Sequence, residues 1–119
     1  MVIADTSVWI SHLTQKNSHL EALLDEGLVA VHPFVIGELA CGRLKNRREI
    51  LHLLQALPDT PVAQPSELLY FIDQRGLAGS GIGLVDAHLL ASSELMKVML
   101  WTSDKSLQRI ATALNLAYV

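Results

Sequence analysis

Short apolar runs that alternate with stretches of helical periodicity limit the folds open to this chain more than any other feature. Residues 2–4, 28–31 and 98–101 are apolar throughout, which is typical of strands buried on both faces. The stretches between them place apolar residues at helical spacing. We therefore expect an α/β fold, a three-layer sandwich in which helices flank a mainly parallel central sheet.

The remaining elements follow from caps, turns and periodicity. Two further short strands are expected at residues 62–63 and 117–119, and a flexible connection at residues 76–83. No repeat or linker divides the 119 residues, and half of them are apolar, so residues 1–119 are predicted to form a single domain with its own core. Helices are expected from Ser7 onward and over residues 18–26, 34–42, 48–57, 66–75, 84–95 and 105–114.

The charge balance excludes broad electrostatic binding to nucleic acid or to an anionic membrane. Nine Lys and Arg residues stand against 12 Asp and Glu residues, so any contact with nucleic acid must be local. The densest basic segment, residues 43–48, is a candidate for such a contact with an RNA backbone. Cys41 is the only cysteine, and the chain shows neither a basic leader nor an apolar run of about 18 residues. These features favour the cytoplasm and no membrane insertion.

Four acidic residues interrupt apolar surroundings: Asp5, Glu38, Asp86 and Asp104. Each alone could cap a helix or form an ion pair. Asp5 and Asp104 both follow predicted strands, however, and the carboxyl ends of parallel strands meet at one rim. If all four acids gather there, like charges about 4 Å apart repel by ~4 kcal/mol, so the cluster needs a cation. An all-oxygen ligand set favours Mg²⁺ or Mn²⁺ over zinc.

Four segments also resemble, in order, the motifs of PIN-domain nucleases, and specifically of VapC-type toxins. They are DTSVW at residues 5–9, ELACG at 38–42, VDAHLLA at 85–91 and WTSDK at 101–105. The resemblance implies a PIN-like fold in which Asp5, Glu38, Asp86 and Asp104 bind one or two divalent ions. It also implies that Ser7 helps to order the site and that Thr102 supports it. Ser103 departs from the basic or amide residue common in the family, which puts substrate contacts at that position in doubt.

The resemblance further implies a function and a set of partners. The function is a metal-dependent endoribonuclease, the toxin of a type II toxin-antitoxin pair, which hydrolyses RNA such as tRNA or rRNA to leave 5′-phosphate and 3′-hydroxyl ends. The partners are the RNA substrate, a cognate antitoxin that covers the acidic pocket, and a second copy of the chain. The apolar surface for such contacts is expected on the helices at residues 20–24 and 51–57.

Two other classes of function stay open. A phospho-signalling receiver domain has similar length and alternation, with Asp59 and Lys105 as its phosphoacceptor and lysine. Ala4 stands where receivers carry a second acid, however, and no apolar strand precedes Asp59. A non-catalytic RNA-binding or assembly module is the other alternative, because a fold does not fix a function. His88 lies two residues from Asp86, and on a helix that spacing indicates a packing or surface histidine and not a ligand.

Overall fold

Three short parallel strands form the sheet of this protein. The computed structural model describes residues 1–118. β1 (Val2–Ala4) lies between β2 (Val29–Ala30) and β3 (Met99–Trp101), and Val2 is paired with both Val29 and Met99. All three residues of β1 are buried, as expected for a central strand covered on both faces. The predicted parallel sheet is confirmed.

Single bridges extend the sheet at both edges, and here the sequence prediction was less accurate. Val31 pairs with Asp59, and Leu100 pairs with Ala117, both in parallel. The strand expected at residues 62–63 does not form, because the backbone N–H of Val31 donates instead to the carbonyl of Pro58 at 3.0 Å. The strand expected at residues 117–119 is reduced to the bridge at Ala117, and Val119 lies outside the described residues.

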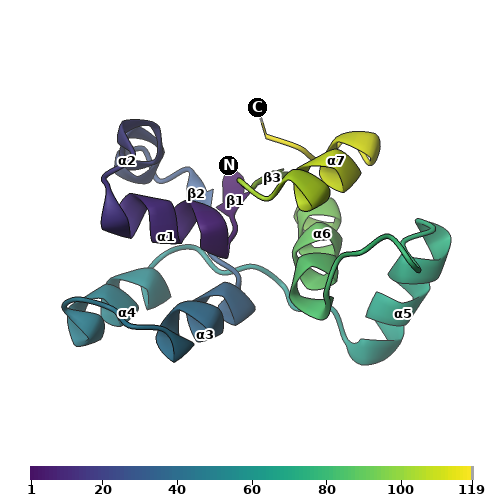
Figure 1. Cartoon of the computed structure of the whole chain (residues 1–119), viewed down its shortest axis with the longest axis horizontal. Coiled ribbons are helices and arrows are strands. Elements are labelled where there is room, and N and C mark those ends of the chain that lie inside the picture. Colours follow the sequence, from purple (N-terminus) through teal and green to yellow (C-terminus); the bar gives the residue numbers. More distant parts are fainter. Residues whose placement is uncertain (119) are drawn as a thin grey trace.

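Helices lie on both sides of the strands (Figure 1), which confirms the predicted α/β architecture. The paired helices α3 and α4 lie toward one end of the long axis, and α5 lies toward the other. The longest helix has 13 residues, and within residues 1–118 none has the length and apolar character needed to cross a membrane. The helices are α1 (Thr6–Thr14), α2 (Ser18–Asp25), α3 (Pro33–Cys41), α4 (Arg47–Gln55), α5 (Pro65–Gln74), α6 (Leu84–Met96) and α7 (Lys105–Ala113).

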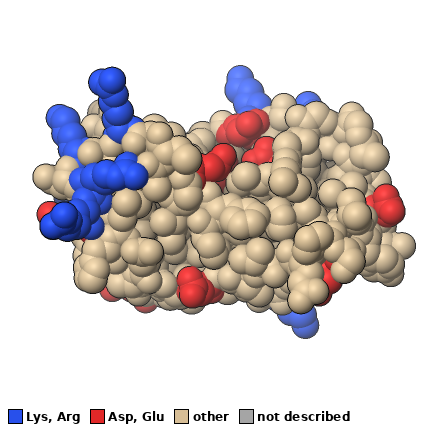
Figure 2. Space-filling view, turned by 90° about the horizontal axis from the view of Figure 1, so that it is seen from below, with Lys and Arg blue, Asp and Glu red and all other residues tan. Residues whose placement is uncertain are grey.

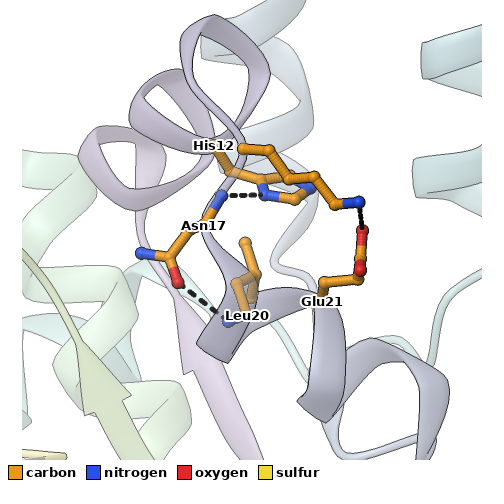
Figure 3. Close-up of polar contacts among 5 residues, drawn as sticks. His12, Asn17, Leu20 and Glu21 are labelled. Carbon is orange, nitrogen blue, oxygen red and sulfur yellow. Dashed lines mark hydrogen bonds and ion pairs between the residues drawn. The ribbon is translucent and has the colours of Figure 1, made fainter.

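A small network of polar contacts fixes the corner between α1 and α2 (Figure 3). The backbone N–H of Asn17 donates to Nδ1 of His12 at 3.0 Å, while the Asn17 side chain accepts from the N–H of Leu20 at 3.0 Å and so caps α2. Lys16 and Glu21 form an ion pair across the same corner. Together these contacts set the direction of α2, and Leu20 is completely buried in the core.

Leu20 belongs to one of the two segments expected to form the apolar partner surface, yet it is buried. Most of the apolar residues at 20–24 and 51–57 pack in or against the core, with Leu53 as an exposed exception. The structure therefore does not support those two segments as the partner surface. Other large apolar side chains are exposed: Met1, Ile10, Leu13, Phe34, Val62, Leu69, Tyr70, Leu84, Leu95 and Met99.

Two histidines, His32 and His88, lie close together at the start of α3. His32 is completely buried and caps α3, since its Nδ1 accepts from the N–H of Phe34 at 3.0 Å. The ring centroids of His32 and His88 lie 6.1 Å apart, and the Phe34 ring meets both edge-on. Burial, followed by the proximity of His88, lowers the pKa of His32 to about 4. His88 is thus a packing residue, as its position predicted.

The lowered pKa predicts how stability depends on pH. Because the folded chain binds the His32 proton less readily than the unfolded chain, the stabilising contribution is complete above the ordinary value of 6.5 and is lost as the pH falls toward about 4. We expect the stability of the wild type to fall more steeply over this range than that of His32→Asn, which keeps an acceptor for the cap. Urea unfolding at several pH values measures this.

The matched control is His52→Asn, because His52 is exposed on α4. That variant should follow the pH dependence of the wild type. Carboxylates also titrate in this range, but they do so in all three proteins. Identical slopes for the wild type and His32→Asn would show that burial of His32 does not destabilise the fold in acid.

Candidate active site

Asp5 lies at the centre of the hydrogen bonds between the first strand and its neighbours. It follows β1 and caps α1, and its Oδ1 accepts from the N–H of Val8 at 3.1 Å and from Oγ of Ser7 at 2.5 Å. Its Oδ2 accepts from Oγ1 of Thr102. The residue is only 5% exposed. A buried carboxylate requires such donors, and here they fix its position.

Thr102 joins Asp5 to the turn that follows β3. Besides donating to Asp5, its Oγ1 accepts from the backbone N–H of Asp104 at 3.0 Å. The N–H of Ser103 donates to Oγ of Ser7 at 3.0 Å. Asp104 in turn caps α7, accepting from the N–H of Ser106 at 2.8 Å. The side chains expected to support the site therefore tie the two strand ends together.

Glu38 reaches the same region from helix α3. It is exposed, and its Oε1 accepts from Oγ1 of Thr6 at 2.6 Å. Thr6 is the first residue of α1, so this bond joins α1 to α3. Thr6 was not predicted as part of the site, because the two residues are 32 positions apart and no local pattern indicates that they meet.

The electrostatic surroundings of Asp86 show that the four predicted acids share one region. Asp86 lies half-buried in the first turn of α6. Burial raises the pKa of its carboxyl, as do the charges of Asp104, Asp5 and Glu38, while a backbone hydrogen bond from Gly83 acts in the opposite direction. Figure 2 shows acidic side chains gathered between the two ends of the molecule on the face seen from below.

No cationic side chain neutralises this acidic cluster, which consists of Asp5, Glu38, Asp86 and Asp104. Within residues 1–118 the ion pairs join Lys16 to Glu21 and Arg75 to Glu94, and neither includes a member of the cluster. In the same part of the chain, no three His, Cys, Asp or Glu side chains converge closely enough to hold a metal ion as they stand. The cluster is therefore a set of carboxylate oxygens without a cationic partner, and the side chains as placed are too far apart to bind one ion together.

A family model described as the PIN domain matches residues 2–113. The chain belongs to the PIN domain family. This PIN domain is also 44% identical, over 109 residues, to "Ribonuclease VapC32" of Mycobacterium tuberculosis, a match that covers 91% of this chain and 88% of that protein. The resemblance to PIN-domain nucleases of the VapC type, inferred from four short segments, is confirmed.

Solved structures agree on the fold. PAE2754 from Pyrobaculum aerophilum superposes with a TM-score of 0.67 at 16% identity, over 92% of this PIN domain and 83% of that chain. FitAcB from Neisseria gonorrhoeae superposes with a TM-score of 0.60 at 20% identity, over 98% and 95% of the two chains. At identities this low the likeness shows a shared fold and does not fix the function.

The residue that a receiver domain would phosphorylate, Asp59, does not lie in the acidic cluster. Asp59 is exposed and lies in the bridge beside Val31 at the edge of the sheet. Its charge is not among those that act on Asp86. The acidic cluster of this PIN domain is thus built without the residue that a receiver domain would phosphorylate.

The bonds of Thr102 predict that its hydroxyl is needed for stability. Thr102→Val keeps the shape of the side chain but removes a donor to buried Asp5 and an acceptor for the N–H of Asp104. We expect a loss of about 1–3 kcal/mol in the free energy of unfolding, measured with urea near neutral pH. Thr102→Ser keeps the hydroxyl and should lose less. A stable valine variant beside a destabilised serine variant would assign the role of Thr102 to its methyl group.

Proposed function

We propose that this PIN domain is a metal-dependent endoribonuclease that hydrolyses RNA phosphodiester bonds and acts as the toxin of a type II toxin-antitoxin pair. The observation that carries the proposal is the unneutralised gathering of Asp5, Glu38, Asp86 and Asp104. The 44% identity to a ribonuclease supports it. We propose tRNA and rRNA as the substrates to test first.

The donor chemistry of the cluster fits a hard divalent cation, Mg²⁺ or Mn²⁺. When bound, such an ion lowers the pKa of a coordinated water and offsets the negative charge of the phosphate. The four acids would hold it. Burial and, after it, repulsion from the other three carboxylates raise the pKa of Asp86. A cation would relieve the repulsion, so the free cluster is electrostatically prepared for one.

The four acids differ in how firmly the fold holds them. Asp5 and Asp104 are fixed by hydrogen bonds from backbone and hydroxyl groups. Glu38 is exposed and is held only by the hydroxyl of Thr6, which donates to one of its two carboxylate oxygens. We propose that Asp5 and Asp104 form the rigid side of the site, while Glu38 and Asp86 adjust when the ion binds. Ser7 and Thr102 orient Asp5 and are positioning residues.

The unneutralised cluster also supports the proposal of an antitoxin. The VapC-type resemblance implies a partner segment that covers the acidic pocket, often with an arginine. A guanidinium placed there would form charge-assisted hydrogen bonds with carboxylates that have no cationic partner within residues 1–118. The resemblance implies homodimerisation as well, and we include it in the proposal.

Removal of single carboxylates tests the proposed site. We expect purified protein to cleave discrete sites in total RNA with Mg²⁺ or Mn²⁺ and not with a chelator. Asp5→Asn and Asp86→Asn should each lower the rate about a hundredfold or more, because several kcal/mol of charge stabilisation is lost. Asp59→Asn is the matched control, since Asp59 is exposed and outside the cluster.

Cleavage that persists in a chelator, or in both cluster variants, would contradict the assignment of the site. Folded wild-type protein that leaves every RNA intact would favour the non-catalytic RNA-binding or assembly module. Loss of cleavage in Asp59→Asn with retention in Asp86→Asn would show that the chemistry lies elsewhere in the fold.

Thermal unfolding tests the metal site without any cleavage assay. Without metal, Asp86→Asn should be at least as stable as the wild type, because the substitution removes a repelled charge. Saturating Mn²⁺ should raise the melting temperature of the wild type by roughly 10 °C, since binding at about 100 times Kd contributes ~2.7 kcal/mol. The rise should be much smaller in Asp86→Asn, and equal rises in both proteins would place the ion elsewhere.

A further inference from the structure

A group of cations projects from one end of the molecule. Arg43, Lys45, Arg47 and Arg48 lie in the turn between α3 and α4 and in the first turn of α4, and all four are exposed. They make up four of the nine Lys and Arg residues of a chain with a net charge of −3. Figure 2 shows basic side chains crowded at one end of the same face on which acidic side chains gather. We call these four residues the basic corner.

The fold does not use the charges of the basic corner. None of the four forms an ion pair within residues 1–118, and their one hydrogen bond runs from Nη1 of Arg47 to the carbonyl of Gly42 at 3.3 Å. Four like charges within six positions repel one another. Asn46, in the left-handed conformation, gives α4 no side-chain cap, so the N–H groups of its first turn have no partner within the helix; Glu49 is the one acid of that turn. The four cations and these N–H groups are suited to an anion with several negative charges.

The position of the basic corner relates it to the acidic cluster. Glu38 lies on α3, which ends at Cys41, and the corner begins two residues later. The helical part of this separation, from Glu38 to Cys41, spans about 4.5 Å at 1.5 Å per residue, and the turn that carries the corner follows directly. An RNA strand with one phosphate at the acidic cluster can therefore place neighbouring phosphates over the basic corner.

We propose that the basic corner holds the RNA backbone on one side of the scissile bond. The inference rests on the proposed ribonuclease function and adds where the substrate lies. Arg47 and Arg48 can each form paired bonds with phosphate oxygens, while Lys45 acts as a point charge. Contacts of this kind position the strand without reading its sequence. A planar anionic membrane fits less well, because it would also meet the acidic remainder of the surface.

The salt dependence of RNA binding tests the proposal separately from catalysis. A fluorescent single-stranded RNA is titrated with the full chain in a chelator, at roughly 50 to 200 mM salt. The double variant Arg47→Gln with Arg48→Gln should bind about tenfold more weakly at low salt. Its slope of log K against log salt should be smaller in magnitude by about 1.4, because each of the two lost phosphate contacts contributes about 0.7 for a single strand. Arg47→Lys with Arg48→Lys should recover most of the slope.

The matched control removes the same number of charges elsewhere. Lys16→Gln with Lys97→Gln changes two exposed cations outside the corner and should leave most of the affinity and slope intact. With metal present, the corner variant should cleave with a raised KM and a nearly unchanged kcat, because the corner does not touch the reacting atoms.

Four outcomes of these measurements decide between the explanations. Equal slopes for the wild type and the corner variant would overturn the proposal, as would a control that loses as much affinity as the corner variant. Unchanged RNA binding with loss of antitoxin binding would also overturn it and assign the corner to an acidic protein segment. Wild-type protein that shows the expected salt dependence but never cleaves RNA would refute the proposed function and leave the corner standing as an RNA-binding surface.

Discussion

The arrangement of this protein depends on the hydrogen bonds made by one buried carboxylate, that of Asp5. Both of its oxygens are used, one by Ser7 and the start of α1, the other by Thr102. Its backbone N–H continues the pairing of β1 with β3 by donating to the carbonyl of Trp101 at 2.9 Å. Burial of a charge is costly without such donors. The same bonds therefore stabilise the junction of two strands with two helices and set the position of the candidate site.

The parts of the fold that follow from local chemistry could be predicted from the sequence. The three strands were visible as apolar runs, and the helices began at capping residues such as Asp5 and Asp104. Because both acids follow strands of a parallel sheet, topology alone places them at one rim. Glu38 and Asp86 lie on helices, so their arrival there depends on packing. The family resemblance, and not periodicity, assigned those two to the site.

The parts that depend on distant partners could not be predicted. The hydroxyl of Thr6 on α1 donates a hydrogen bond to Glu38 on α3, and no pattern in the sequence predicts that contact. The pair Val62 and Ala63 looked like a strand, yet the open edge at Val31 is met earlier, at Pro58 and Asp59. Helical periodicity likewise marked apolar faces without showing which ones the core would cover. In each case competition among tertiary partners decided the outcome.

In the described part of the chain, ion pairs do not neutralise the charges of the acidic cluster or of the basic corner, which leaves both groups free to bind a partner. Helix α3 carries Glu38 near its end, and the basic corner follows within a few residues, so opposite charges could have paired at short range. They remain apart, and within residues 1–118 neither the acidic cluster nor the corner takes part in an ion pair. Surface ion pairs contribute little to stability, so folding loses little by this separation. Under the proposed function, a phosphate backbone bridges the two regions, with a cation between it and the acids.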